Sequence, residues 1–90
     1  MRVESVEIYS DATNPAVLRH PARRFPGVLV QGDSLHSLCV ALDEICSKLC
    51  LQIDAETYRH ADDVRNSMRS YLTHYKAVMR QHDLPLPFSE

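Results

Sequence analysis

The sequence has few of the residues that make tight turns and large aromatic cores. Its 90 residues include two glycines, no tryptophan and only 7% aromatic residues. No uninterrupted apolar run approaches the roughly 20 residues that a membrane-spanning helix needs, so no membrane segment is expected. Neither sign of charge is in large excess, since the formal net charge is −2. Because dedicated nucleic-acid binders are usually basic overall, this balance argues against that class.

The three cysteines are too few and too close together for a disulfide framework. Cys39, Cys46 and Cys50 lie within twelve residues, in one predicted helix and at its end, where only Cys46 and Cys50 could be bridged, with poor geometry. No CxxC pair or interleaved histidine accompanies them, so no metal site and no cofactor is predicted. Small buried thiols are typical of a reducing compartment, and the N-terminus lacks the apolar centre of a secretory signal. The sequence therefore predicts a cytoplasmic protein.

The residues that are present indicate one domain of the α+β class, spanning residues 1–90. Alternating polar and apolar residues, bounded by turn residues, predict a small three-stranded antiparallel sheet. Its strands are expected at about residues 3–10, 16–20 and 27–31. A helix over 34–49 is expected to pack its apolar arc on this sheet, and a long helix over about 54–82 follows.

Local signals mark where the two helices begin. Gly32 is expected to supply a permissive turn after the third strand, with Asp33 or Ser34 as the helix cap. Asp54 is a natural N-cap for the second helix. That helix would be roughly 40 Å long, more than a domain of this size can cover. Its apolar stripe is therefore the best physical indication of a partner, either a second copy or a different protein.

The run Gly32-Asp33-Ser34-Leu35 matches the signature of GDSL esterases, in which the serine is a nucleophile. Such a nucleophile needs a histidine base held by an acid, together with oxyanion donors. The only Asp-x-x-His pair here joins Asp33 to His36 and overlaps the supposed nucleophile. No glycine follows position 32. The motif is therefore interpreted as a helix start, and no catalytic residue is predicted.

Basic side chains form the most organised candidate binding surface. Four of them lie within about 60° of one another on the second helix, and three arginines with His20 surround the turn between the second and third strands. Contact with an acidic partner or phosphates is the functional interpretation. The alternative, slightly favoured for the helix, is that long basic side chains cover the edge of an apolar face. The Arg23–Arg24 pair is the better binding candidate. The predicted partner-binding residues are Arg19, Arg23, Arg24, Arg65, Arg69, Tyr75, Lys76 and Arg80.

The segment FPGVLVQGDSLHSLCVALDEICSKL, residues 25–49, resembles HicB-like antitoxins, in which a Pro-Gly-containing strand ends in Gly-Asp-Ser/Thr-Leu and starts a helix. The resemblance implies a HicB-like core over residues 1–50, with three antiparallel strands packed on that helix, and neutralisation of a small toxin. The sequence departs from the family at Ser37, where an acidic residue is usual, and in the long helix and tail over 54–90. No appended DNA-binding segment is visible.

The whole chain resembles a family of small uncharacterised bacterial proteins, through TNPAVLRHP, RRFPGVLVQGDSL and LTHYKAVMRQHDLPLPF. This resemblance implies a bacterial origin and no known activity. Together, the features favour a non-enzymatic protein-binding module of the antitoxin or immunity type, which occludes a small toxin or effector. The alternative is a homodimeric regulatory or ligand-sensing module that pairs through the long C-terminal helix. Nucleic-acid binding through the basic patches is the weakest of the three hypotheses.

Overall fold

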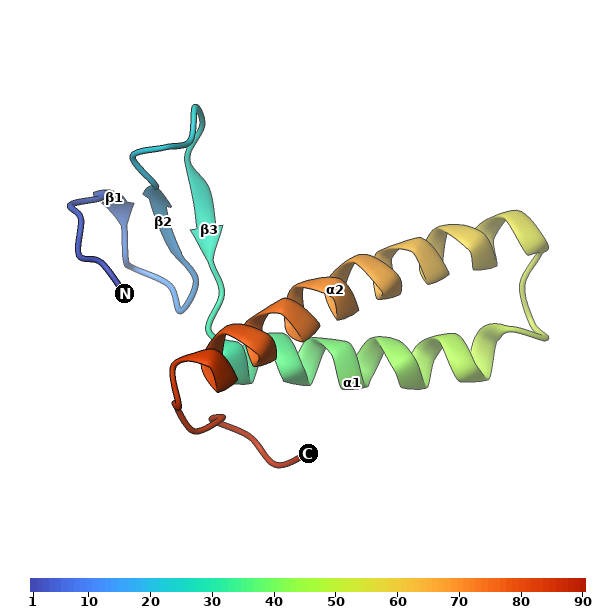
Figure 1. The fold of residues 1–90 in the computed structure, drawn as a ribbon. Helices are drawn as coiled ribbons and strands as arrows, with labels where there is room; N and C mark the ends of the chain where they lie inside the picture. The colour runs from blue at the N-terminus through green and yellow to red at the C-terminus, as the bar shows by residue number, and fades with distance from the viewer. The chain divides into compact units, whose positions relative to one another are not determined.

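The computed structural model describes residues 1–90 and confirms the α+β class. A three-stranded antiparallel sheet is followed by two helices, of which the second is long (Figure 1). By its internal contacts the chain divides into two compact units, Met1–Gln31 and Gly32–Glu90. We describe each unit by itself, and the expectation of a single domain stays a prediction. Neither helix combines the length and the apolar composition that crossing a membrane requires.

The sheet has the order β1-β2-β3, with β2 in the middle (Figure 1). Its strands are shorter than the sequence predicted: β1 is Glu7–Ser10, β2 is Ala16–Arg19 and β3 is Gly27–Leu29. An antiparallel ladder extends only as far as its partner strand, so a four-residue β2 limits both neighbours. The residues predicted to lengthen β1 and β3 therefore lie outside the ladder. A β-bulge between Ile8 and Ser10 further interrupts the pairing of β1 with β2.

Helix α1 is Gly32–Leu49, so it begins two residues earlier than the sequence predicted. Gly32 is the first helical residue, and its φ is not positive. The Asp33 carboxylate accepts the backbone N–H of Ser34 at 2.8 Å from inside the first turn. Gly32 is therefore not needed for a permissive turn, and neither predicted capping residue precedes the helix.

Helix α2 is Ala55–Gln81, close to the predicted long helix. Its predicted N-cap is confirmed: Asp54 has extended backbone, and its carboxylate accepts the Thr57 backbone N–H at 2.9 Å. The helix ends in a Schellman motif, with Asp83 at a φ of 56°. In that motif the N–H of Leu84 donates to the Met79 carbonyl, at 2.9 Å, and the N–H of Asp83 to the Arg80 carbonyl, at 3.2 Å.

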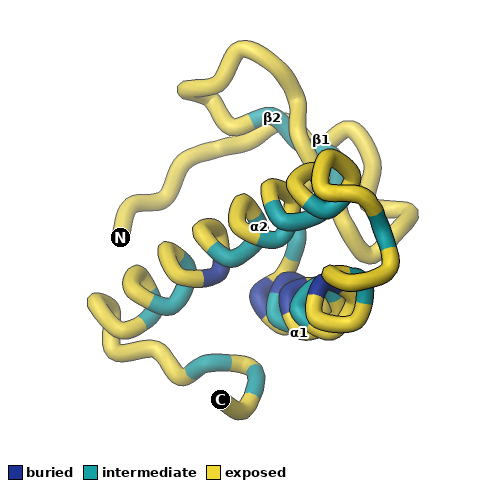
Figure 2. The backbone as a smooth tube through the Cα atoms, turned by 90° about the vertical axis from the view of Figure 1, so that its right-hand side faces the viewer, coloured by how far each residue is buried: buried dark blue, intermediate teal, exposed yellow.

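The core lies between α1 and α2, which pack as an antiparallel hairpin (Figures 1 and 2). Residues of low exposure recur every three and four positions on both helices, which is the seven-residue period of a coiled coil. This stripe is formed on α1 by Gly32, Leu35, Cys39, Leu42, Cys46 and Leu49, and on α2 by Tyr58, Ala61, Arg65, Met68, Leu72, Tyr75 and Met79. Beside the stripe, Ser34, His36, Asp43, Asp62, Arg69 and Lys76 are also partly covered. The apolar arc that the sequence assigned to the sheet is thus covered by α2 along this stripe.

The close packing of the hairpin is clearest at its open end, where α1 begins. A Cβ placed on Gly32 would overlap the ring of Tyr75, because the three nearest atoms all belong to that ring. Only a glycine therefore allows α2 to approach so closely at this position. Phe88, from the segment that follows α2, packs on the same end, with its ring centroid 6.5 Å from that of Tyr75 and 4.1 Å from that of His36.

Candidate protein-binding surfaces

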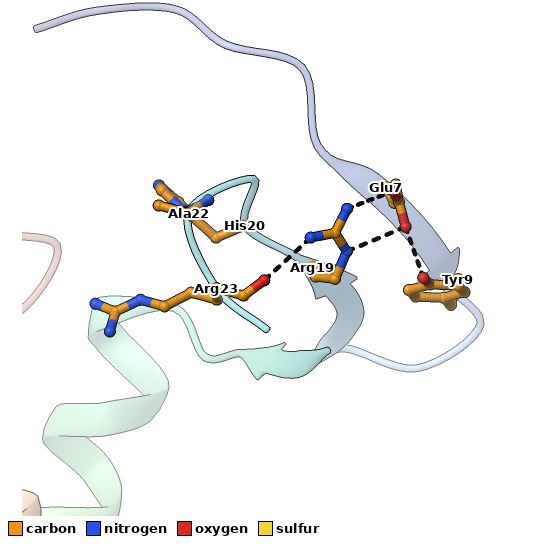
Figure 3. Close-up of polar contacts among 6 residues, drawn as sticks. All are labelled: Glu7, Tyr9, Arg19, His20, Ala22 and Arg23. Carbon is orange, nitrogen blue, oxygen red and sulfur yellow. Dashed lines mark hydrogen bonds and ion pairs between the residues drawn. The ribbon is translucent and has the colours of Figure 1, made fainter. Parts of the chain in front are cut away.

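In the sheet unit, the Arg19 side chain contacts both strand β1 and the turn that follows β2 (Figure 3). It stands opposite Glu7 in the β1–β2 register, and its Nη2 donates to Glu7 Oε1 at 2.6 Å. Its Nη1 donates to the Arg23 carbonyl at 3.0 Å, so the turn is attached to the same guanidinium. Tyr9 donates its hydroxyl to Glu7 Oε2 at 2.6 Å. Arg19 is therefore engaged within the unit, and its predicted role in partner binding stays a prediction.

These contacts shift the acid–base behaviour of Glu7. The hydrogen bond from Arg19 is the largest cause, followed by the hydrogen bond from Tyr9 and the charge of Arg19, and together they lower the pKa of Glu7 from 4.5 to about 2. The same carboxylate raises the pKa of Tyr9 above 10.0. The three residues thus form one charged cluster across β1 and β2.

The turn after β2 presents the two arginines that the sequence favoured. Pro21 occupies its second position, as is common in β-turns, and the backbone N–H of Arg23 donates to the His20 carbonyl at 2.9 Å. The Arg23 guanidinium extends away from the Arg19 cluster (Figure 3). Arg24 has its guanidinium carbon 5.2 Å from the centre of the Phe25 ring, a cation–π arrangement. Neither arginine side chain makes an ion pair.

Apolar side chains next to this turn were not singled out from the sequence. Phe25 is 71% exposed, and Val28 and Leu29 of β3 are 65% and 53% exposed. β3 is also an edge strand, so one side of its backbone has no ladder partner. The signal in the sequence that could have found them is the apolar run VLV, which follows the Arg23–Arg24 pair closely in the chain. Val28 and Leu29 are consecutive in β3, so their side chains point to opposite faces of the sheet, on either side of its free edge. We call Arg23, Arg24, Phe25, Val28 and Leu29 together the turn surface.

The basic residues of α2 are mostly paired within the helical unit. Arg65 pairs with Asp62, and Arg69 reaches across to Asp43 of α1. Lys76 pairs with Glu90 at 2.8 Å, and this hydrogen bond is the main reason that the pKa of Glu90 is lowered. The predicted residues Arg65, Arg69 and Lys76 are therefore half-buried and already neutralised, as expected of side chains that cover the edge of an apolar stripe.

The other two predicted residues of α2 differ in exposure. Tyr75 is half-buried between Gly32 and Phe88, so it packs inside the hairpin. Arg80 is exposed and makes no ion pair, although its charge contributes to lowering the pKa of Glu90. The structure therefore separates the predicted residues into a paired set on α2 and an unpaired set on the turn surface, with Arg80 exposed at the end of α2.

The apolar residues of the two helices also divide. Five of the apolar residues that lie outside the packed stripe are each between 36% and 60% exposed: Leu38 and Ile45 of α1, and Val64, Tyr71 and Val78 of α2. On each helix these residues are seven apart and lie on one side of the packed stripe. We call these five residues the apolar flank. Their seven-residue spacing does not distinguish them from the core, because the packed residues recur at the same spacing.

The structure contains no group of three or more His, Cys, Asp or Glu residues that could hold a metal ion. All three cysteines are free, with Cys39 and Cys46 buried and Cys50 exposed. Every buried side-chain nitrogen or oxygen has a hydrogen-bond partner. The candidate binding surfaces of the chain are the turn surface and the apolar flank.

A comparison with curated proteins and with solved structures finds no match to this chain. A protein-family model described as a family of unknown function (DUF6959) matches residues 1–88. Because this match includes both the sheet unit and the helical hairpin, it covers nearly the whole chain. The chain therefore belongs to the family of unknown function DUF6959.

Proposed function

We propose that this chain is a non-enzymatic protein-binding module of the antitoxin or immunity type, which occludes a partner protein through its turn surface. The observation that carries the proposal is the pairing of two arginines that lack ion-pair partners with three exposed apolar side chains. Protein interfaces are enriched in arginine and aromatic residues, and such residues supply most of the binding energy. The partner surface is acidic, with an apolar centre.

The open edge of β3 supports the same assignment. An extended segment of a partner can add to an exposed strand, with backbone hydrogen bonds for affinity and side-chain pockets for specificity. β3 is three residues long, so only a short segment can pair with it. The guanidinium groups of Arg23 and Arg24 then lie beside that segment and select acidic residues in it.

The antitoxin class rests on the resemblance of residues 25–49 to HicB-like antitoxins, in which the partner is a small toxin. A bacterial origin and a cytoplasmic location belong to the same proposal. Supporting it further requires the partner itself.

The test is a pull-down from the source organism with the tagged wild-type chain and with the Arg23→Glu/Arg24→Glu variant. We expect a stoichiometric protein with the wild type and at least a 100-fold loss of its affinity in the variant, because two attractive contacts become repulsive. The bound protein, expressed alone, should arrest growth, and co-expression of the wild-type chain should restore it.

Arg59→Glu is the matched control, because Arg59 is exposed on α2 and makes no ion pair. It changes the net charge in the same direction and by half as much, so a general effect of charge would appear in it as well. Equal retention of the partner by the wild type and by the double variant would show that the turn surface does not bind it.

A further inference from the structure

The two sides of the helical hairpin have opposite chemistry. On one side Asp43 of α1 meets Arg69 of α2, so these two flanks of the helices face each other. His36 and Lys76 lie on the same side, and the segment after α2 covers them through Phe88 and Glu90. On the other side of its packed stripe, each helix has a second row of residues, and in an antiparallel pair these two rows lie on the same side of the hairpin. The apolar flank lies in these two rows.

The apolar flank is almost without charge. Thr57 continues the row of the flank on α2, and the next row outward holds Ser34, Ala41, Lys48, His60, Ser67, His74 and Gln81. Lys48 is the only Asp, Glu, Lys or Arg residue among these positions, although 24% of the chain is charged. The solvent face of a helix normally carries charged residues. A face that lacks them and exposes Leu, Ile, Val and Tyr is one that another surface covers.

We propose that a second copy of this chain covers the apolar flank, so that two hairpins form a four-helix bundle. The proposal goes beyond the proposed function, because it involves the purified chain alone and a different surface. Self-pairing needs a patch that meets itself without repulsion, and a flank with one lysine at its end satisfies this condition. A flank suited to a charged partner would carry a complementary charge.

The size of the flank agrees with a dimer. With 18 residues, α1 is about 27 Å long, and two adjacent helices are about 20 Å wide. Two such faces cover about 1,000 Å² in total, which is the size at which specific interfaces begin. The flank is mainly aliphatic with one aromatic residue, Tyr71, near the middle of α2, the position of an interface anchor.

The experiment measures the mass of the purified wild-type chain by light scattering and by sedimentation equilibrium over a concentration series. We expect twice the 10.3 kDa chain mass. Tyr71→Glu should give a folded monomer and raise the dimer dissociation constant about a thousandfold, since two-fold symmetry places two carboxylates in the interface. Circular dichroism checks the folding of this variant, and Val64→Glu provides a second position on the same row.

Thr73→Glu is the matched control, because Thr73 is exposed on the same helix but away from the apolar flank. It should remain dimeric, as should Arg23→Glu/Arg24→Glu, which alters the turn surface alone. A monomeric wild-type chain at every concentration would overturn the dimer and leave the proposed function untouched. Dimers of unchanged affinity in both Tyr71→Glu and Val64→Glu would likewise exclude this flank.

Discussion

At Gly32 the backbone of α1 meets the ring of Tyr75, and the missing side chain is what makes room for it. The position has an ordinary helical φ, so the glycine is required by space and not by conformation. Phe88 holds the ring from a second direction, with ring centroids 6.5 Å apart. The ring therefore cannot move aside without cost, and the residue at position 32 controls how closely the helices pack.

We predict that Gly32→Ala changes the sign of its effect when Tyr75 is truncated. In the wild type the added methyl group overlaps the ring, and we expect a loss of about 1–3 kcal/mol of unfolding free energy. In a Tyr75→Ala background the overlap is gone, and the alanine should stabilise by about 0.4–1 kcal/mol, because it restricts the unfolded chain. Urea denaturation of the four proteins measures this cycle. An equal effect of Gly32→Ala in both backgrounds would contradict it.

The low pKa of Glu7 leads us to predict that the stability of the sheet unit depends on pH in acid. Its pKa in the folded chain, about 2, is below the usual 4.5, so the folded state favours the carboxylate. The stability that this provides is complete above pH 4.5 and is lost as the pH falls through about 2. NMR titration of the Glu7 carboxyl carbon should give the low pKa directly. Arg19→Gln should return it most of the way to the usual value, because Arg19 is the main cause of the shift.

Among the elements, the helices could be predicted more fully than the strands. Asp54 marks the start of α2 because capping depends on residues that are adjacent in sequence. The extent of β1 depends on the length of β2, which no local signal contains. The apolar arc of α1 was visible, but Leu38 and Leu35 have the same local pattern. Which of them faces α2 is decided by the crossing of two helices, a tertiary property.

The same contrast between local signals and tertiary properties applies to the candidate surfaces. Arg23 and Arg24 could be identified because a proline-bounded turn exposes its side chains whatever surrounds it. The partners of Arg69 and Lys76 could not, because Asp43 and Glu90 are 26 and 14 residues away in the chain. Pairing over such distances requires the fold. The sequence therefore shows where the basic side chains stand along the chain, and it cannot distinguish those that the fold neutralises from those that it leaves free.

The end of α2 offers a prediction about a single element. Asp83 has a left-handed backbone at a φ of 56°, in the position of the Schellman motif that glycine usually occupies. Asp83→Gly should therefore stabilise the chain by about 0.5–1 kcal/mol, by relieving the conformational cost of a side chain. Asp83→Ala serves as the control, since it removes the carboxylate and keeps the Cβ. Thermal denaturation compares the variants, and equal gains from glycine and alanine would assign the effect to charge instead.

For the whole molecule, the main constraint on stability is the small number of side chains that are buried. Four apolar side chains are buried, three of them on α1, and no residue of Met1–Gln31 is buried. A core of this size supplies modest stability, and small domains commonly add to it by association. If two hairpins pair through the apolar flank, folding and association are linked. The melting temperature of the wild-type chain then rises with protein concentration, and that of Tyr71→Glu does not.

The three cysteines of the chain allow the separation of α1 from α2 to be measured by thiol modification. Cys50 is exposed, so a thiol reagent reaches it without any separation of the helices, and its modification calibrates each experiment internally. Cys39 and Cys46 are fully covered between the helices, so they react only when α1 and α2 separate. The delay between the modification of Cys50 and that of Cys39 and Cys46 therefore measures how often the helices separate, and the wild-type chain needs no introduced label for this measurement.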